Sequence, residues 1–376
     1  MTTTYDFVIL GLSITSSWGN GHATTYRALV RELARRHHRV LFLERDVPWY
    51  AQNRDLYHPP YGRTELYGSF EELVDRFGGI VRDADVVVVG SYVPEGARVG
   101  AWVNSHARGK TAFYDIDTPV TLRDVGRGCC EYLTADLIPR YDLYLSFTGG
   151  TTLETLEKRF GAARARPLYC SVDPEAYSPV ESEPPRWDLG YLGTYSADRQ
   201  PTLDALLVET ARAWPEGRFV VAGAQYPSTL AWPENVARVE HVSPREHRSF
   251  YGAQRFTLNV TRADMARAGW SPSVRIFEAA ACGVPIVSDE WPGMASFLVP
   301  GREILVARTA RDALAIVHGM PESERRAIAT RARARVLREH TAERRAEALE
   351  GWIREAFELD ASQRAAGWRG ASSDLT

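Results

Sequence analysis

A lone carboxylate in an apolar helical stretch is the most chemically informative feature of the sequence. Glu278 lies in Phe-Glu-Ala-Ala-Ala-Cys, shortly after the turn that contains Ser271 and Ser273. Such a turn opens a helix, whose free N–H groups and positive dipole end can hold phosphate oxygens. A carboxylate there is costly unless it accepts hydrogen bonds, and a ribose diol offers two donors. The segment predicts a nucleotide site; the alternative is a Glu that only caps its own helix.

Arginine supplies nearly all the positive charge that a diphosphate would need. Of the 45 basic residues only Lys110 and Lys158 are lysines, and both precede the second half of the chain. Arg199 and Arg275 are the predicted diphosphate ligands, because two guanidinium groups can hold the anion bidentately without a metal. Arg262 is a third candidate. The alternative for each is an ordinary surface arginine in an Arg-rich chain.

The first half offers a candidate base. His22 follows the glycine-rich segment that begins at Gly11 and lies near the start of a predicted helix. The dipole there disfavours imidazolium and keeps the ring able to accept a proton, although a capping or core histidine is an equal alternative. The glycine spacing is not G-x-G-x-x-G, so Glu44 is only a minor indication of a nicotinamide site.

Two carboxylates, Asp115 and Asp117, end a predicted strand. As a D-x-D pair they would bind a divalent metal and a diphosphate. Alternatively Asp117 orients His22 through a hydrogen bond or touches the donor sugar, or one of the pair caps the turn at Thr118. We favour Asp117 as the partner of His22 and predict no metal site.

Aromatic and amide side chains near these loops are candidates for binding an acceptor. Trp18 and Asn20 lie beside His22, and Trp49 and Tyr50 follow the second predicted strand. Rings at the mouth of a cleft suit a sugar or another flat acceptor, whereas loop aromatics also simply pack.

The elements that must position these residues alternate between short apolar strands and amphipathic helices. Continuous runs such as Asp85-Val-Val-Val-Val-Gly90 suit a parallel sheet covered on both faces. Candidate strands in the first half are Phe7–Leu12, Val40–Glu44, Val86–Ser91, Thr111–Asp117, Leu143–Phe147 and Pro167–Cys170. Those in the second half are Leu189–Leu192, Phe219–Ala222, Arg238–His241, Thr257–Val260, Pro285–Ser288 and Ile304–Val306.

These patterns predict an α/β protein with two doubly wound, Rossmann-like domains that face a cleft. A proline-rich stretch without periodicity separates them, and helix-forming residues close the chain. The expected divisions are 1–171 for the first domain, 172–187 for the linker, 188–341 for the second domain, 342–359 for a helix that returns to the first domain, and 360–376 for a flexible tail.

Length and charge limit the classes of protein. The 376 residues suffice for two domains, and the net charge of −3 gives no global field for nucleic acid or an anionic membrane. The four cysteines lack C-x-x-C spacing, which favours reduced thiols. The N-terminal residues lack a signal peptide pattern and no membrane segment is evident, so we expect a cytoplasmic protein.

The stretch from Phe277 to Ile286, Phe-Glu-Ala-Ala-Ala-Cys-Gly-Val-Pro-Ile, resembles the nucleotide-sugar half of GT-B glycosyltransferases. The likeness is to the group 1 type and to its bacterial, spore-maturation CgeB-like branch. It implies that Glu278 binds the nucleotide ribose. The loop from Gly193 to Arg199 resembles the one that meets the diphosphate, which adds Thr194 to the donor residues. Many group 1 members carry another Glu where this sequence has Trp270. The sugar-contacting role of that Glu is therefore unassigned in this chain.

The resemblance implies transfer of a sugar from a nucleotide diphosphate sugar, UDP- or dTDP-linked, to an acceptor hydroxyl, with no cofactor beyond that co-substrate. His22 would then be the catalytic base of an inverting enzyme. Two other classes stay open, a nucleotide-sugar 2-epimerase of the same fold and a non-catalytic coat or scaffold protein. The acceptor is unassigned, and neither nucleic acid nor a membrane segment is expected among the partners.

Overall fold

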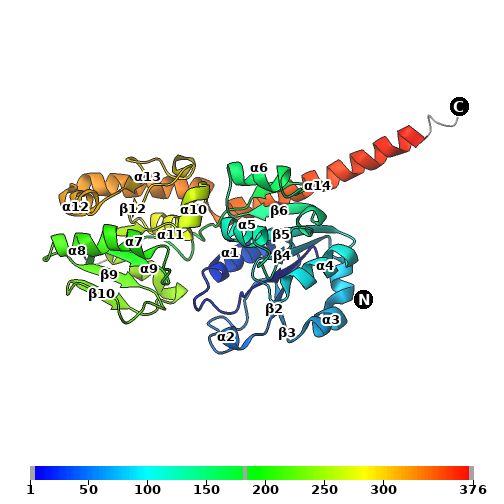
Figure 1. Ribbon diagram of the computed structural model, residues 1–376, viewed down its shortest axis with the longest axis horizontal. Helices are drawn as coiled ribbons and strands as arrows, with labels where there is room; N and C mark the ends of the chain where they lie inside the picture. The colour runs from blue at the N-terminus through cyan, green and yellow to red at the C-terminus, as the bar shows by residue number, and fades with distance from the viewer. Residues whose placement is uncertain (1–4, 181–183, 372–376) are drawn as a thin grey trace.

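The computed structural model describes residues 5–180 and 184–371, with side chains as far as residue 359. The chain forms two parallel sheets, each covered by helices, which lie side by side with the first domain on the right in Figure 1. The predicted α/β architecture with two Rossmann-like domains is therefore confirmed.

The first domain contains a seven-stranded sheet of order β3-β2-β1-β4-β5-β6-β7. Its strands are β1 (Phe7–Gly11), β2 (Val40–Arg45), β3 (Arg63–Tyr67), β4 (Val86–Gly90), β5 (Lys110–Asp115), β6 (Leu143–Ser146) and β7 (Ala165–Pro167). Its helices are α1 (His22–Arg35), α2 (Pro48–Ala51), α3 (Phe70–Asp83), α4 (Gly96–His106), α5 (Thr118–Gly126), η1 (Ile138–Arg140) and α6 (Thr151–Lys158). Strand β1 pairs in parallel with both β2 and β4, so Phe7 aligns with Val40 on one side and Val86 on the other.

The second domain contains a six-stranded sheet of order β10-β9-β8-β11-β12-β13. Its strands are β8 (Trp187–Leu192), β9 (Phe219–Ala222), β10 (Val236–Val239), β11 (Gln254–Asn259), β12 (Ile286–Ser288) and β13 (Leu305–Val306). The helices that follow β8 in the chain are α7 (Gln200–Leu203), η2 (Asp204–Val208), α8 (Glu209–Ala213), α9 (Pro244–Gly252), α10 (Ala263–Ala268), α11 (Val274–Ala281), η3 (Met294–Ser296), α12 (Ala310–Gly319), α13 (Glu322–Glu339) and α14 (Ala342–Ala371).

The strand order reverses at one place in each sheet. In the first domain β1 lies between β2 and β4, and in the second β8 lies between β9 and β11. The loops that leave neighbouring strands at such a point diverge to opposite faces and leave a crevice at the carboxyl ends of the strands. Both sheets therefore offer a crevice where their first strand ends.

Two segments join the domains. An isolated parallel bridge pairs Val172 with Thr341, so the outgoing and the returning chain lie side by side. The Arg345 Nε donates hydrogen bonds to the carbonyl oxygens of Tyr169 and Cys170, at 3.1 and 3.3 Å. Helix α14 then packs on α1 and extends beyond the first domain (Figure 1). Residues 181–183 of the predicted linker lie outside the described residues.

Several elements differ from the sequence-based expectation. Strand β3 was not expected, because Arg-Thr-Glu-Leu-Tyr at a sheet edge has little apolar content to signal a strand. Strands β7 and β10 each begin two residues earlier than predicted. Helix α14 continues to Ala371, so the tail predicted from residue 360 begins as helix, which its Ala, Gln and Arg content favours. Residues 372–376 lie outside the described residues.

Candidate active site

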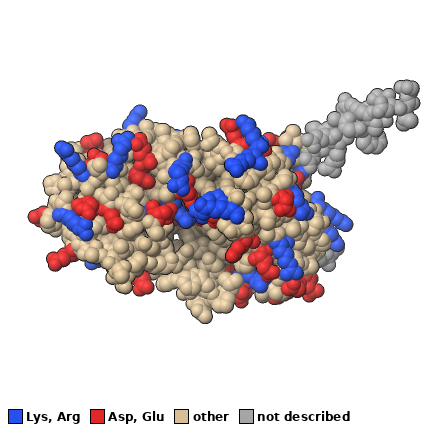
Figure 2. Space-filling view, viewed as in Figure 1, with Lys and Arg blue, Asp and Glu red and all other residues tan. Residues whose placement is uncertain are grey.

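A cleft of about 500 Å³ lies between the two domains, and both crevices open into it. Figure 2 shows the surface hollowed there, with basic side chains along the upper edge of the hollow. Most of the predicted site residues line this cleft: His22, Asn20, Tyr50, Asp117, Thr194, Arg199, Arg262, Ser271, Ser273, Arg275 and Glu278.

Glu278 lies on α11, in the cleft, with 3% of its surface exposed. The Tyr251 hydroxyl donates a 2.9 Å hydrogen bond to Glu278 Oε2, and His247 Nδ1 lies 3.9 Å from the same oxygen. The helix begins after Ser273, whose Oγ accepts from the Arg275 N–H at 3.3 Å. A buried carboxylate therefore stands one turn inside a helix whose N-terminus faces the cleft, as the sequence predicted.

Arg275 is held rigidly by neutral groups. Its Nε donates to the Leu192 carbonyl at 2.6 Å, its Nη1 donates to Asn259 Oδ1 at 2.9 Å, and its guanidinium lies 4.7 Å from the centre of the Tyr191 ring. Only 6% of the residue is exposed. No carboxylate of the described residues forms an ion pair with this guanidinium. A buried positive charge without a partner favours an anionic ligand.

Arg199, like Arg275, forms no ion pair with a carboxylate among the described residues, whereas Arg262 does. Arg199 Nη2 donates to the Thr194 carbonyl at 2.6 Å, and its buried Nε lacks a hydrogen-bond partner among the described residues. In contrast Arg262 reaches across the cleft to Asp117, at 3.5 Å, and lies 3.8 Å from Asp198. The structure thus leaves two of the three predicted arginines available to a diphosphate.

Ser271 occupies the junction of the domains. Its hydroxyl pairs with the Thr148 hydroxyl of the first domain at 2.9 Å and contacts Met265 Sδ at 3.1 Å. The neighbouring Trp270 carbonyl accepts from the Gly149 N–H at 3.0 Å. The turn before α11 therefore contacts the first domain as well as the cleft.

His22 begins α1 and faces the cleft. Its backbone N–H donates to Asn20 Oδ1 at 3.1 Å, and its buried Nδ1 has no hydrogen-bond partner among the described residues. Burial lowers the pKa of the imidazole, the Asp117 carboxylate opposes this, and the Arg262 charge adds to it. The ring is therefore neutral near pH 7 and able to accept a proton.

Asp117 does not form the expected hydrogen bond to His22. Its Oδ2 accepts from the Tyr92 hydroxyl at 2.8 Å and from Arg262 Nη1 at 3.5 Å. Asp115 is fully buried and accepts from Tyr144 at 2.5 Å and from the Asp117 N–H at 3.2 Å. Burial raises the pKa of Asp115 to about 6. The two carboxylates thus accept hydrogen bonds from different side chains. The described residues contain no group of three or more possible metal-ligating side chains.

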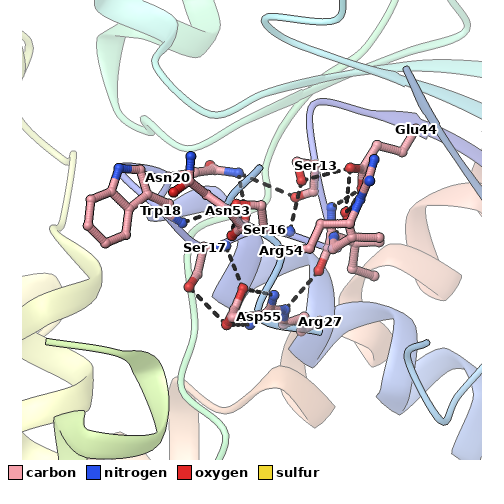
Figure 3. A network of polar contacts seen from close by, with 12 residues as sticks. Ser13, Ser16, Ser17, Trp18, Asn20, Arg27, Glu44, Asn53, Arg54 and Asp55 are labelled. Carbon is pink, nitrogen blue, oxygen red and sulfur yellow. Dashed lines mark hydrogen bonds and ion pairs between the residues drawn. The ribbon is translucent and has the colours of Figure 1, made fainter. Parts of the chain in front are cut away.

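Glu44 anchors the loop that leads to His22 (Figure 3). This fully buried carboxylate accepts hydrogen bonds from the Ser13 and Thr15 hydroxyls, at 3.0 and 2.6 Å, and from the Ile14 and Thr15 N–H groups, at 2.7 and 3.0 Å. Arg54 Nε in turn donates to the Thr15 hydroxyl at 3.1 Å. Because four donors occupy Glu44, it is not available to a nicotinamide ribose.

The four candidate acceptor residues separate into two pairs. Asn20 and Tyr50 line the cleft, and Asn20 Nδ2 also donates to the Ser16 carbonyl at 3.2 Å, which shapes the loop. Trp18 packs across the domain boundary on His241, with ring centres 4.3 Å apart. Trp49 is 52% exposed and lies outside the cleft lining.

Sequence reasoning missed several residues of the cleft. They are Tyr92, His241, His247 and Tyr251, all of which line it. Tyr92 follows β4, and the run Asp85-Val-Val-Val-Val-Gly90 marked that strand end as a cleft position. The others carried no comparable local signal.

Comparison with known proteins identifies a related family and related folds. Residues 199–351 match the family described as "Glycosyl transferase-like". No curated protein sequence matches the chain. None of the helices in the described residues is long and apolar enough to cross a bilayer.

Several solved structures share the fold, and three of them illustrate the likeness. A sucrose-phosphate synthase from Thermosynechococcus elongatus is 16% identical, with a TM-score of 0.69 over 94% of this chain and 100% of the other. HepE from Anabaena, in complex with UDP and glucose, is 14% identical, with a TM-score of 0.68 over 93% and 100%. An alpha-glucosyltransferase in complex with UDP is 10% identical, with a TM-score of 0.68 over 93% and 100%.

The fold is GT-B, as predicted. Together the fold and the family match over residues 199–351 confirm the predicted class, an enzyme of the glycosyltransferase type.

Proposed function

We propose that the chain transfers a sugar from a UDP- or dTDP-sugar to an acceptor hydroxyl without a metal ion. The observation that carries this proposal is the pair of arginines, Arg199 and Arg275, which line the same cleft as Glu278 and form no ion pair with a carboxylate among the described residues. Two guanidinium groups match the charge of a diphosphate. The UDP bound to HepE and to the alpha-glucosyltransferase supports the choice of nucleotide.

In the inverting form of this reaction His22 removes the proton of the acceptor hydroxyl while its oxygen bonds to the anomeric carbon. The bond from that carbon to the diphosphate oxygen breaks, and the diphosphate leaves with the electron pair. Arg199, Arg275 and the α11 N-terminus stabilise its charge. In the retaining form His22 only binds the acceptor. The anomeric proton coupling of the product distinguishes the two, and a retained configuration rules out His22 as the base.

A thermal-shift screen tests the donor. A nucleotide at 100 times its Kd stabilises the fold by about 2.7 kcal/mol. We expect UDP or dTDP to raise the melting temperature more than GDP or ADP, with equal shifts in EDTA and in Mg²⁺. No shift with any of the four contradicts the proposal, and a shift that needs Mg²⁺ contradicts metal independence.

Finer assignments from the sequence stay predictions. These are membership of the CgeB-like branch, bacterial origin, a cytoplasmic location and the lack of a nucleic-acid partner. The acceptor-binding roles of Trp18, Asn20, Trp49 and Tyr50 have the same standing.

A further inference from the structure

Three loops of the first domain meet beside the cleft, although they are far apart in the sequence. They follow β1, β4 and β5, which are neighbours in the sheet. The first loop leads to His22, the second contains Tyr92 and the third contains Asp117. The Ser91 hydroxyl accepts from the Ile116 N–H at 3.1 Å, and the Ser91 N–H donates to the Tyr114 carbonyl at 2.9 Å. The second and third loops are therefore fastened to each other.

Tyr92 has a backbone conformation that a tyrosine rarely adopts. Its φ of 64° lies in the left-handed region, where a side chain with a Cβ is disfavoured. Such outliers persist where the surroundings hold them and often mark functional positions. Here the Tyr132 ring packs on Tyr92 with a centre-to-centre distance of 4.7 Å, and Tyr132 is itself fixed by a 2.8 Å hydrogen bond to Thr121.

In this conformation the Tyr92 ring lies beside the candidate base and its hydroxyl contacts Asp117. The ring lies 5.6 Å from the His22 ring, centre to centre, and the hydroxyl donates to Asp117 Oδ2 at 2.8 Å. Burial and the neighbouring carboxylates raise the pKa of Tyr92, so the phenol stays protonated and remains a donor. One oxygen of Asp117 thus accepts hydrogen bonds from both Tyr92 and Arg262, while His22 Nδ1 has no hydrogen-bond partner among the described residues.

We propose that Tyr92 is a positioning residue, whose hydroxyl holds the Asp117 carboxylate away from the His22 imidazole and leaves that imidazole without a hydrogen bond to a carboxylate. The charged or titratable groups that face His22 are Asp117, Tyr92 and, from the other domain, Arg262. A direct carboxylate–imidazole pair would favour imidazolium, which cannot accept a proton. Tyr92 prevents that pair from forming. The consequence for sugar transfer rests on the proposed function, whereas the charge state of His22 does not.

The experiment is an NMR titration of the histidine rings in the full chain, with the His22 signal assigned from its loss in His22→Gln. In Tyr92→Phe the freed carboxylate turns to the imidazole, and the pKa of His22 rises by about one unit. Adding Asp117→Asn to Tyr92→Phe abolishes the rise. The control Tyr141→Phe removes a buried tyrosine hydroxyl that does not line the cleft, and it leaves the titration unchanged.

A Tyr92→Phe protein that melts like the wild type and titrates like it overturns the proposal. Should that variant not fold, Asp117→Asn alone decides. Because Tyr92 already holds the carboxylate, this change lowers the pKa of His22 by less than half a unit, whereas a fall of about one unit reveals a direct Asp117–His22 pair and overturns the proposal. Where transfer is measurable, the acid limb of the kcat profile moves to higher pH in Tyr92→Phe. Failure of the nucleotide screen leaves this titration intact, so the two proposals fail separately.

Discussion

A guanidinium group that is buried without a carboxylate carries a charge that the folded chain itself does not neutralise. Most arginines in this protein are paired, for example Arg27 with Asp55 at 2.8 Å. Arg275 instead has only neutral partners, and Arg199 has one unused buried Nε. Because burying a charge without a counter-charge is costly, this arrangement supports the proposal that an anionic donor binds there.

At the residue scale, Arg199→Ala and Arg275→Ala each weaken UDP or dTDP binding by about 10- to 100-fold, as expected for the loss of a charged hydrogen bond. Arg275→Lys weakens binding less than Arg275→Ala, because lysine keeps the positive charge although it loses the bidentate hydrogen bonding of the guanidinium group. Isothermal titration calorimetry gives the affinities. The control is Arg212→Ala, which removes an arginine that pairs with Glu209 on the surface of α8. Wild-type affinity in both alanine variants shows that the phosphates lie elsewhere.

At the element scale, the loop between β1 and α1 has no regular structure of its own, and a neighbouring strand end holds it. Glu44 at the end of β2 accepts from Ser13, Ile14 and Thr15, which lie about 30 positions earlier in the chain. This anchoring fixes where α1 begins and hence where His22 lies.

The matching prediction is that Glu44→Ala lowers the free energy of unfolding by about 3 kcal/mol, because it leaves buried donors without acceptors. Urea denaturation measures the loss. Nucleotide affinity stays close to wild type, since the proposed donor site is in the second domain. Glu209→Ala, at an exposed ion pair, is the control and changes stability by less than about 0.5 kcal/mol. An equally small change in Glu44→Ala contradicts the anchoring role.

At the scale of the whole molecule, the domains are joined where the chain crosses between them. His340 lies at this crossing, stacked on Phe277 with ring centres 4.6 Å apart, and its Nδ1 lies 3.0 Å from Arg345 Nη2. Burial, and then the Arg345 charge, lowers the pKa of His340 to about 3. The unfolded chain binds a proton at this position near pH 6.5, but the folded chain does not.

This stability contribution is complete above pH 6.5 and is lost as the pH falls toward 3. When the pH falls from 7.5 to 4.5, we expect the free energy of unfolding of the wild type to decrease by about 2–3 kcal/mol because of His340. The His340→Gln variant lacks this decrease. Denaturant unfolding at the two values gives the difference. His58→Gln, at an exposed position, keeps the wild-type dependence. Identical slopes for His340→Gln and the wild type refute the assignment.

The sequence by itself predicted most of the strands and grouped the residues of the proposed donor site. Apolar runs such as Val86–Gly90 specify buried parallel strands, because burial on both faces requires apolar residues throughout. Ser273 caps α11, and Arg275 and Glu278 lie three positions apart on that helix, so their grouping is encoded locally.

Only the tertiary structure decided which distant residues meet. Tyr92, Asp117 and Arg262 come together because β4 and β5 are neighbours and the second domain faces them, and no local pattern encodes that order. The sheet order also explains why Asp117 pairs with a tyrosine in place of the expected His22. It likewise explains why Glu44 accepts hydrogen bonds from the loop between β1 and α1. Hydrogen bonds between loops depend on sheet order and domain packing, which are set by long-range contacts rather than by neighbours in the chain.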